Sequence, residues 1–279
     1  MESRERLDIG QSKAEAIFNV MNTNSAAVGA AGEVTLNLRD GIATVTFGHP
    51  KGNAMPGALL RMLAERISEA GAEPAARVIV LRSGGTGPFC AGASFDELAA
   101  IESADQGKEF FAGFARVILA MIRAPKFIVT RVHGKVAGGG VGLVAASDFS
   151  CAVGAASAKL SELAVGIGPF VVGPAIERKI GLAAFSAMAV DADWRDAEWC
   201  ERHGLYSRVY SDPSALDVGI DTLAETLAKS NLEAMVQLKR VFWAGIQDWD
   251  LLLTERAELS GRMVLSEFTR RAISGFKKR

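Results

Sequence analysis

The stretch SGGTGPFCAGA at residues 83–93 comes directly after a short apolar run at residues 78–81, and four of its residues are glycine. A second stretch, GKVAGGG at residues 134–140, follows the apolar run at 127–132 in the same way. Strand ends that open onto glycine are where α/β sheets usually meet ligands, and a glycine cluster ahead of a helix exposes N–H groups that suit an anion. Close packing of a helix on a strand would require the same glycines, so both explanations stay open for either stretch alone.

The segments around these turns alternate between strand and helix patterns. Residues 34–38 and 42–47 alternate apolar and polar side chains around an Asp-Gly turn, which predicts a β-hairpin. The other predicted elements of this part are helices at 59–70, at 106–123 and from about 140, and strands at 78–81, 127–132 and 149–153. Such alternation favours an α/β fold with crossover connections.

The two ends of the chain lack this alternation. Beyond about residue 182 the strand signals fade, and amphipathic helices are predicted at 183–190, 213–229, 232–246 and 250–275. At the other end, the stretch NTNSAAVGAAG at residues 22–32 is small, polar and without periodicity. Residues 1–32 are therefore predicted to form an N-terminal extension and linker.

Composition excludes several classes of protein. The 279 residues are 49% hydrophobic and 23% charged, which is ordinary for a globular protein, and 31 Lys and Arg against 32 Asp and Glu give a net charge of −1. A chain without excess positive charge is a poor candidate for binding nucleic acid or an anionic membrane. The start of the chain has no apolar leader pattern, and no stretch is apolar enough to span a bilayer. We expect a soluble, cytoplasmic protein.

Three cysteines, Cys90, Cys151 and Cys200, make an odd number without metal-ligand spacing. Buried free thiols in a reducing cytosol are the simplest interpretation, and no metal site is predicted. The segment GVGLVA at residues 140–145 matches a dinucleotide-binding fingerprint. That match is weak, because a hairpin and a crossover precede it, and a nicotinamide dehydrogenase is the least favoured alternative.

Four segments together resemble the crotonase, or enoyl-CoA hydratase/isomerase, family in their order and spacing. They are FGHPKGNAM at 47–55, GPFCAGASFDEL at 87–98, the glycine stretch at 134–140 and LSELAVGIGP at 160–169. The resemblance extends from about residue 33 to 270. It implies an α/β fold in which a crotonase-like spiral core of ββα turns covers residues 33–195.

The resemblance also implies a C-terminal helical region at 196–279 that serves trimerisation, giving a homotrimer or a dimer of trimers. The implied substrate is an acyl-CoA thioester, so that coenzyme A enters as part of the substrate and no separate cofactor is expected. The implied pathway context is fatty acid metabolism.

The site residues follow from the motif positions. The resemblance assigns an oxyanion hole to the backbone N–H groups of Ala93 and Gly139, and acid/base work to the carboxylate of Glu162. Preorganised donors of this kind typically contribute about 3–4 kcal/mol each to a developing oxyanion. The residues expected to bind substrate are Lys51, Ala54, Ala91, Phe95, Gly138 and Phe170.

Two departures from the family pattern bear on the reaction. The position of the family's first carboxylate holds Gly142, and Phe170 stands where hydratases place a small residue of the following loop. A lone carboxylate can shuttle a proton in both directions but cannot so easily activate water as well. A drier pocket beside Phe170 would raise the pKa of Glu162.

These departures favour isomerisation of 3-enoyl-CoA to 2-enoyl-CoA. Hydration of a 2-enoyl-CoA, including a branched or methylglutaconyl-type substrate, remains the alternative. A catalytically silent acyl-CoA-binding scaffold is a third possibility.

Five other positions have simpler structural explanations. Cys90 is expected to be a buried thiol rather than a nucleophile, and His133 a structural histidine at a strand end. Ser94 is expected to cap the helix that begins near Asp96. Lys277 and Lys278 could approach the phosphates of coenzyme A, although a solvated tail explains them as well.

Overall fold

The computed structural model describes residue 29 and residues 31–276. Nearly all of the predicted extension at 1–32, and the basic pair Lys277 and Lys278, therefore lie outside the described residues.

The main sheet has six strands in the order β1-β2-β3-β4-β6-β9. They are β1 (Glu33–Arg39), β2 (Ile42–Gly48), β3 (Val78–Ser83), β4 (Ile128–Val132), β6 (Phe149–Val153) and β9 (Arg208–Tyr210). The predicted hairpin is confirmed, because β1 and β2 pair in antiparallel fashion around Asp40 and Gly41, which both have positive φ. Every other neighbouring pair of this sheet is parallel.

A smaller sheet of three strands lies beside the main one. It contains β5 (Val136–Ala137), β7 (Ser157–Lys159) and β8 (Arg195–Asp196), in the order β5-β7-β8. Strand β5 lies within the second glycine stretch and leads directly into its three consecutive glycines at 138–140. This sheet therefore fixes where those three glycines begin.

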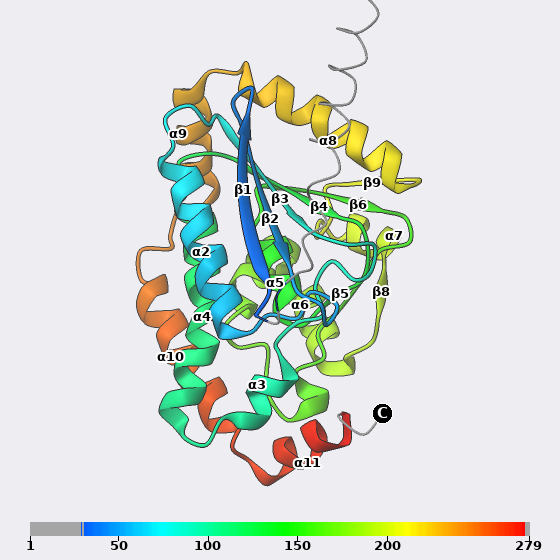
Figure 1. The fold of residues 1–279 in the computed structure, drawn as a ribbon. Coiled ribbons are helices and arrows are strands. Elements are labelled where there is room, and N and C mark those ends of the chain that lie inside the picture. The colour runs from blue at the N-terminus through cyan, green and yellow to red at the C-terminus, as the bar shows by residue number, and fades with distance from the viewer. Residues whose placement is uncertain (1–28, 30, 277–279) are drawn as a thin grey trace, which may run out of the picture.

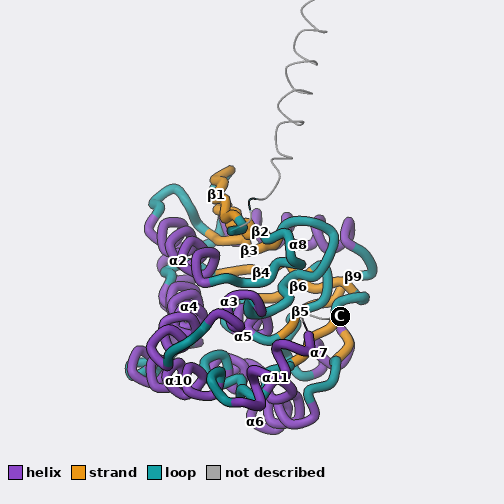
Figure 2. The backbone as a smooth tube through the Cα atoms, turned by 60° about the horizontal axis from the view of Figure 1, so that its bottom comes forward, coloured by secondary structure: helices purple, strands orange, loops and turns teal. Residues whose placement is uncertain are grey.

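Helices cover both faces of the main sheet (Figure 1). Helix α2 (Gly57–Ala72) packs beside β1 and β2, while α8 (Pro213–Ala228) packs across β3, β4 and β6 on the other face. The remaining helices are α3 (Phe95–Ala100), α4 (Ala104–Arg123), α5 (Gly139–Ala145), α6 (Gly173–Asp191), α7 (Ala197–Arg202), α9 (Leu232–Phe242), α10 (Trp249–Met263), α11 (Glu267–Phe276) and the short 3₁₀ turn η1 (Leu163–Val165). Figure 2 shows α3 and α5 near the middle of the view and α11 below them, farther from β1.

Two glycines of helix α4 allow close approaches on two sides, one to the backbone of α10 and one to a side chain of α2. A Cβ placed on Gly107 would lie 2.7 Å from the Cα of Gly261 in α10, and one on Gly113 would lie 2.9 Å from Cδ1 of Leu60 in α2. Only glycine permits helices to come this near. The side chains that α4 presents inward are therefore fixed relative to both neighbouring helices.

The C-terminal part is helical as predicted, with differences at three points. Gly181, with φ of 77°, interrupts α6, so the helix predicted at 183–190 is only its second half. The helix predicted at 250–275 is two helices, α10 and α11, separated at residues 264–266. Strands β8 and β9 lie within this part, where β8 pairs with β7 and β9 with β6, and the sequence pattern indicated neither.

The described residues include no helix that is both long and apolar enough to cross a membrane.

Candidate active site

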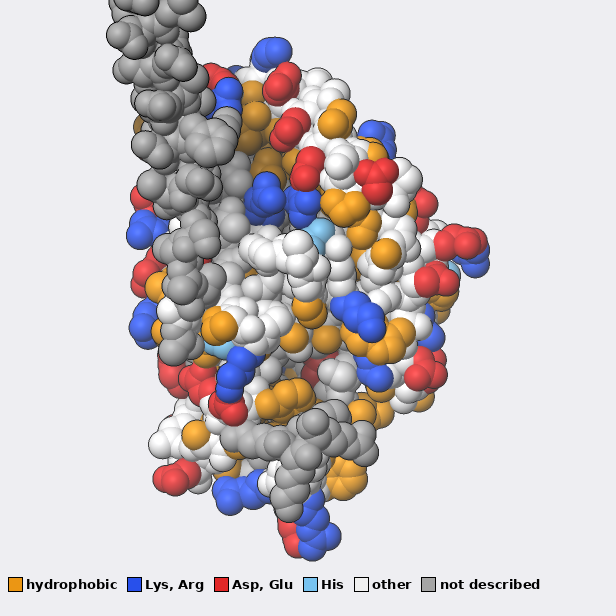
Figure 3. Space-filling model, turned by 45° about the vertical axis from the view of Figure 1, so that its right-hand side comes forward, with side chains coloured by type: hydrophobic (Ala, Val, Ile, Leu, Met, Phe, Trp, Pro, Cys, Tyr) orange, Lys and Arg blue, Asp and Glu red, His pale blue; other side chains and the backbone are white. Residues whose placement is uncertain are grey.

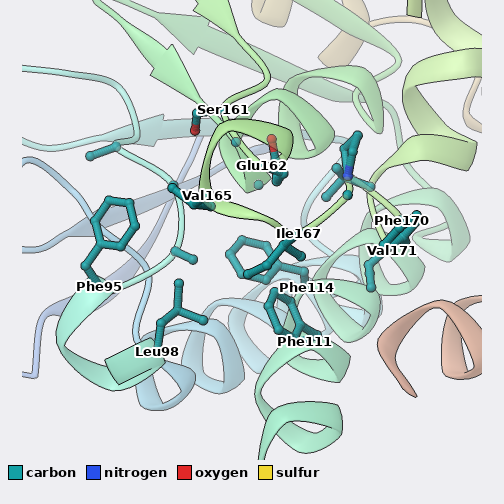
Figure 4. A pocket seen from close by; sticks show the side chains of 18 residues that line it. Phe95, Leu98, Phe111, Phe114, Ser161, Glu162, Val165, Ile167, Phe170 and Val171 are labelled. Carbon is teal, nitrogen blue, oxygen red and sulfur yellow. The ribbon is translucent and has the colours of Figure 1, made fainter. Parts of the chain in front are cut away.

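One pocket brings together the two glycine stretches and the segment at residues 161–172. Figure 4 shows it from close by, with Phe111 and Phe114 across the pocket from Ser161 and Glu162. Apolar side chains larger than alanine make most of its wall: Phe95, Leu98, Phe111, Phe114, Val165, Ile167, Pro169, Phe170, Val171 and Val172.

The first glycine stretch presents the N–H group of Ala93. Gly92 has φ of +90°, a conformation that suits glycine, and its carbonyl accepts a 2.8 Å hydrogen bond from the N–H of Met55. Ser94 in turn donates its N–H to the carbonyl of Met55 at 3.3 Å. These two bonds hold the turn on both sides of Ala93, whose own N–H has no acceptor within the described part of the chain.

The second stretch presents the N–H group of Gly139 in the same way. Gly138, with φ of +51°, donates its N–H to the carbonyl of Lys159 at 2.9 Å, and its own carbonyl accepts from the N–H of Val141 at 2.9 Å. Gly139 is the first residue of α5, where N–H groups lack intrahelical partners. No described residue supplies an acceptor for its N–H.

The two turns are in contact with each other. The N–H of Ala137 donates to the carbonyl of Cys90 at 2.8 Å, and a Cβ placed on Gly92 would lie 3.0 Å from the carbonyl oxygen of Ala137 and 3.7 Å from the Cα of Gly138. Glycine at both positions is what allows this approach. Two N–H groups without protein acceptors therefore sit on adjoining turns at one pocket.

Glu162 lies where η1 begins, and its backbone carbonyl accepts hydrogen bonds from Val165 at 3.2 Å and Ile167 at 2.9 Å. One carboxyl oxygen, Oε1, is 3.3 Å from the point that a Cβ on Gly138 would occupy. The other, Oε2, is buried and without a hydrogen-bond partner in the described residues. The carboxyl group therefore faces the turn that carries the Gly139 N–H.

Burial raises the pKa of Glu162 to about 7, while hydrogen bonds from the backbone of Glu162 and Ser161 oppose part of the rise. The apolar wall supplies the physical cause, because a low-dielectric surrounding disfavours the charged form of a carboxyl group. The predicted direction of this pKa shift is confirmed. Such a group can both take up and release a proton near neutral pH.

The position of the missing first carboxylate is closed by another side chain. A Cβ placed on Gly142 would lie 2.6 Å from both Cβ and Cγ1 of Val172. Val172 is itself buried and forms part of the pocket wall. The site therefore has no room at residue 142 for an acidic side chain, and Glu162 is the one carboxylate among the residues that line the pocket.

Two phenylalanine rings pack directly on glycines of the site. A Cβ on Gly139 would overlap the ring of Phe114, and one on Gly168 would overlap the ring of Phe170. Sequence reasoning expected Phe170 in the pocket, with Val171 and Val172 after it making the pocket drier, but did not identify Phe111 or Phe114. The spacing of these two rings on a predicted helix places them on one face, which was an available signal for both.

The pocket contains seven of the nine residues predicted for the site: Glu162, Ala93, Gly139, Ala91, Phe95, Gly138 and Phe170. Lys51 and Ala54 do not line it. Lys51 is exposed and forms an ion pair with Asp96, while Ala54 is buried next to Met55. Figure 3 shows one face of the molecule, on which charged side chains of both signs lie among hydrophobic ones.

The simpler explanations for neighbouring residues agree with the structure. Burial raises the pKa of the Cys90 thiol to about 12, so it is not a reactive thiolate. His133 does not line the pocket, and burial together with Arg131 and Arg82 lowers its pKa. Ser94 caps α3 by accepting a hydrogen bond from the N–H of Glu97. Within residues 29 and 31–276, no group of three or more His, Cys, Asp or Glu side chains could hold a metal ion.

Backbone donors beside a single buried carboxyl group define a site that can stabilise an oxyanion and move a proton. A sequence profile of the enoyl-CoA hydratase/isomerase family matches residues 37–273, and the chain belongs to that family. The crotonase resemblance, the α/β fold and the helical C-terminal region are thereby confirmed.

Curated relatives act on CoA thioesters according to their names. A carnitinyl-CoA dehydratase of Citrobacter koseri is 30% identical over 208 residues, which span 73% of this chain and 77% of that protein. A mitochondrial methylglutaconyl-CoA hydratase of Mus musculus is 30% identical over 158 residues, which span 56% of this chain and 50% of that protein.

Solved structures share the fold along almost their whole length. An enoyl-CoA hydratase from Mycobacterium avium is 26% identical, with a TM-score of 0.77 over 90% of this chain and 97% of that chain. An enoyl-CoA hydratase from Bacillus halodurans has a TM-score of 0.81 over 87% of this chain and 99% of that chain, at 18% identity.

Proposed function

We propose that this protein is an enoyl-CoA isomerase that converts a 3-enoyl-CoA thioester to the 2-enoyl isomer. The observation that carries the proposal is the contact between Val172 and Gly142, which leaves Glu162 as the one carboxylate of the pocket. An isomerisation needs one group that removes a proton and returns it elsewhere. A hydration must also orient and deprotonate water.

In the first step, the thioester oxygen of the substrate accepts hydrogen bonds from the N–H groups of Ala93 and Gly139. The ionised carboxylate of Glu162 takes a proton from C2, and the electron pair of that C–H bond moves toward the thioester carbonyl to form a dienolate. The two N–H groups stabilise its negative oxygen. Because they are fixed in adjoining turns, they need no reorganisation as the charge develops.

In the second step, the protonated Glu162 donates its proton to C4. The C3–C4 double bond becomes a single bond, a double bond forms between C2 and C3, and the carboxylate is regenerated. The raised pKa of Glu162, about 7, suits this cycle, because neither protonation state is strongly disfavoured at neutral pH. No other acid, oxidant or reductant is needed for atoms and electrons to balance.

Hydration of a 2-enoyl-CoA is the second candidate, and the names of the relatives favour it. Those names describe a dehydratase and a hydratase of CoA thioesters. Against hydration stands the apolar side chain of Val172 where a second acid would be required. A catalytically silent acyl-CoA-binding scaffold is the third candidate.

The test offers 3-enoyl-CoA and 2-enoyl-CoA separately and follows the absorbance of the conjugated thioester. We expect the signal to rise with the first substrate and to stay nearly constant with the second. Rapid loss of signal from 2-enoyl-CoA would overturn the isomerase assignment in favour of hydration. The Glu162→Gln variant is the matched control, since it keeps the size and shape of the side chain.

The scaffold alternative has its own measurement. An acyl-CoA bound in deuterated water should exchange its C2 protons if Glu162 acts as a base. We expect exchange with the native protein and none above background with Glu162→Gln. Absence of exchange in both proteins would support a binding role without catalysis.

The oligomeric state, the cellular location and the metabolic pathway of the protein remain predictions. We propose a homotrimer or a dimer of trimers in the cytoplasm, with a role in fatty acid metabolism. Exposed apolar side chains on α6 and α9, including Leu182, Val190 and Val241, support assembly, because monomers rarely leave such groups uncovered in number. Light scattering in solution tests the oligomeric state, and a monomer would contradict it.

A further inference from the structure

We propose that this pocket accepts a compact, uncharged hydrocarbon acyl group, and that Phe114 sets the limit on its length. The inference rests on the proposed function only in that the ligand is an acyl-CoA thioester held at the Ala93 and Gly139 turns. It concerns the wall opposite Glu162 and is independent of whether the reaction is isomerisation or hydration.

The preference for an uncharged group follows from the lining. Ser161 and Glu162 carry the polar side chains among the lining residues, and no Lys, Arg or His lies there. A second carboxylate at the far end of an acyl chain would therefore be taken out of water without a cation to pair with. Burial of an unpaired charge is strongly unfavourable, whereas methyl and methylene groups gain from the same surroundings.

The limit on length follows from the contact between Phe114 and Gly139. A Cβ on Gly139 would overlap the Phe114 ring, so the ring lies directly against the turn that presents the Gly139 N–H. A thioester whose oxygen binds that N–H has its first acyl carbons beside the ring. Phe110 lies behind it, with ring centroids 6.2 Å apart in an edge-to-face arrangement.

The ring cannot easily withdraw to admit a longer chain. Phe114 is 3% exposed, and the helix that carries it is fixed by the close contacts of Gly107 with Gly261 and of Gly113 with Leu60. Movement of α4 away from the pocket would require both neighbouring helices to separate. Phe114 is therefore a rigid wall, and shortening its side chain is the direct way to lengthen the pocket.

The length test measures binding of butyryl-, hexanoyl-, octanoyl- and dodecanoyl-CoA by calorimetry. We expect the native protein to bind dodecanoyl-CoA at least tenfold more weakly than its best ligand, and Phe114→Ala to move the optimum to a longer chain. The matched control is Met121→Ala, which truncates a fully buried side chain of the same helix about two turns away that does not line the pocket. It should keep the native preference.

Two outcomes would overturn the length limit. One is a native protein that binds all four chains equally well or prefers dodecanoyl-CoA. The other is a Phe114→Ala variant with the native preference. If Phe114→Ala does not fold, Phe114→Leu takes its place, since it removes the planar ring but keeps an apolar side chain of similar volume, and a smaller shift in the same direction is expected.

The charge test compares succinyl-CoA with 4-methylpentanoyl-CoA, which has nearly the same shape without the carboxylate. Binding of both ligands is measured in the native protein and in Phe114→Ala, so that a limit on chain length cannot hide an effect of the ligand's charge. We expect succinyl-CoA to bind at least tenfold more weakly. Equal or tighter binding of succinyl-CoA, or of a trimethylammonio-propionyl-CoA relative to 4,4-dimethylpentanoyl-CoA, would overturn the preference for an uncharged group.

These measurements separate the inference from the proposed function, because saturated acyl-CoA esters bind without turnover. A protein that shows the expected chain preference but does not isomerise 3-enoyl-CoA would contradict the proposed function alone. An active isomerase with no effect of Phe114 on chain preference would contradict the inference alone.

Discussion

The two sides of the pocket are built in opposite ways. On one side, backbone N–H groups of Ala93 and Gly139 and the carboxyl group of Glu162 provide every polar group that the proposed chemistry needs. On the other, Phe114 and Val172 provide only apolar surface. The apolar side is therefore part of the chemistry, because it excludes water and its burial of the carboxyl group raises the pKa of Glu162 to about 7.

Among changes to the polar side of the pocket, the Glu162→Gln variant is expected to have the largest effect on activity. We expect turnover of 3-enoyl-CoA to fall by about 10³-fold, within the range that general acid–base groups usually contribute. Binding of a saturated acyl-CoA should change little, because the variant keeps both N–H donors and the apolar wall. Steady-state kinetics and calorimetry measure the two quantities. Turnover within tenfold of the native value would remove Glu162 from the mechanism.

The apolar side is tested by the pH dependence of stability. Glu162 has a pKa of about 7 in the folded protein against an ordinary value of 4.5. The folded state therefore holds its proton where the unfolded state has lost it, and stability falls as pH rises from about 4.5 to 7. Linkage sets the full loss at up to about 3 kcal/mol above pH 7.

The Glu162→Gln variant lacks this titration and is the control for it. We expect its Tm to exceed that of the native protein at pH 8 by more than it does at pH 5. The same raised pKa predicts that kcat/KM of the native enzyme rises with pH through about 7, because the base must be ionised. A Tm difference that does not change between the two pH values would show that the carboxyl group is not buried.

The contact between Gly142 and Val172 is tested by a double-mutant cycle. Gly142→Ala introduces a methyl group 2.6 Å from the Val172 side chain, and we expect a loss of about 1–3 kcal/mol in the free energy of unfolding. Val172→Gly removes both of the carbons that would overlap, so the double variant should lose less than the two single variants together, by about 1 kcal/mol or more. Denaturant unfolding measures all four proteins, and simple additivity would contradict the contact.

The smallest effect on activity is expected from alkylation of the cysteines, including Cys90 beside the turn that carries the Ala93 N–H. Burial raises the pKa of Cys90 to about 12, and Cys151 and Cys200 are also buried with raised pKa values. A thiol-alkylating reagent at pH 8 should therefore leave the folded protein active and label it only after unfolding. Rapid inactivation of the folded enzyme, measured by activity and mass spectrometry, would show that one of these thiols reaches the pocket.

The polar side could be predicted from the sequence because it is made of local motifs. The turn at Ala93 depends on the adjacent Gly92, and the turn at Gly139 depends on Gly138, so the chain itself carries the information. Glu162 was assigned from the resemblance to the family, by its place in a third motif. The hairpin and the buried parallel strands were likewise visible as local patterns of side chains.

Phe95 and Phe170 of the apolar side were expected in the pocket, but the contacts that shape this side could not be predicted, because they join distant segments. Nothing near Gly142 indicates that Val172 fills the space above it, and nothing near Gly139 indicates the ring of Phe114. Strand β9 was missed for a related reason. Its three residues, Arg208–Tyr210, are too few for an alternating pattern, and pairing with β6 is what makes them a strand.

Product identification by NMR tests the central proposal most directly. The native enzyme is incubated with 3-hexenoyl-CoA in deuterated water, and the products are followed with time. We predict 2-hexenoyl-CoA as the accumulating product, with deuterium exchange at C2 and C4 as the dienolate forms and returns. Accumulation of 3-hydroxyhexanoyl-CoA instead would contradict the proposal, because it would show that this single-carboxylate pocket admits and activates water.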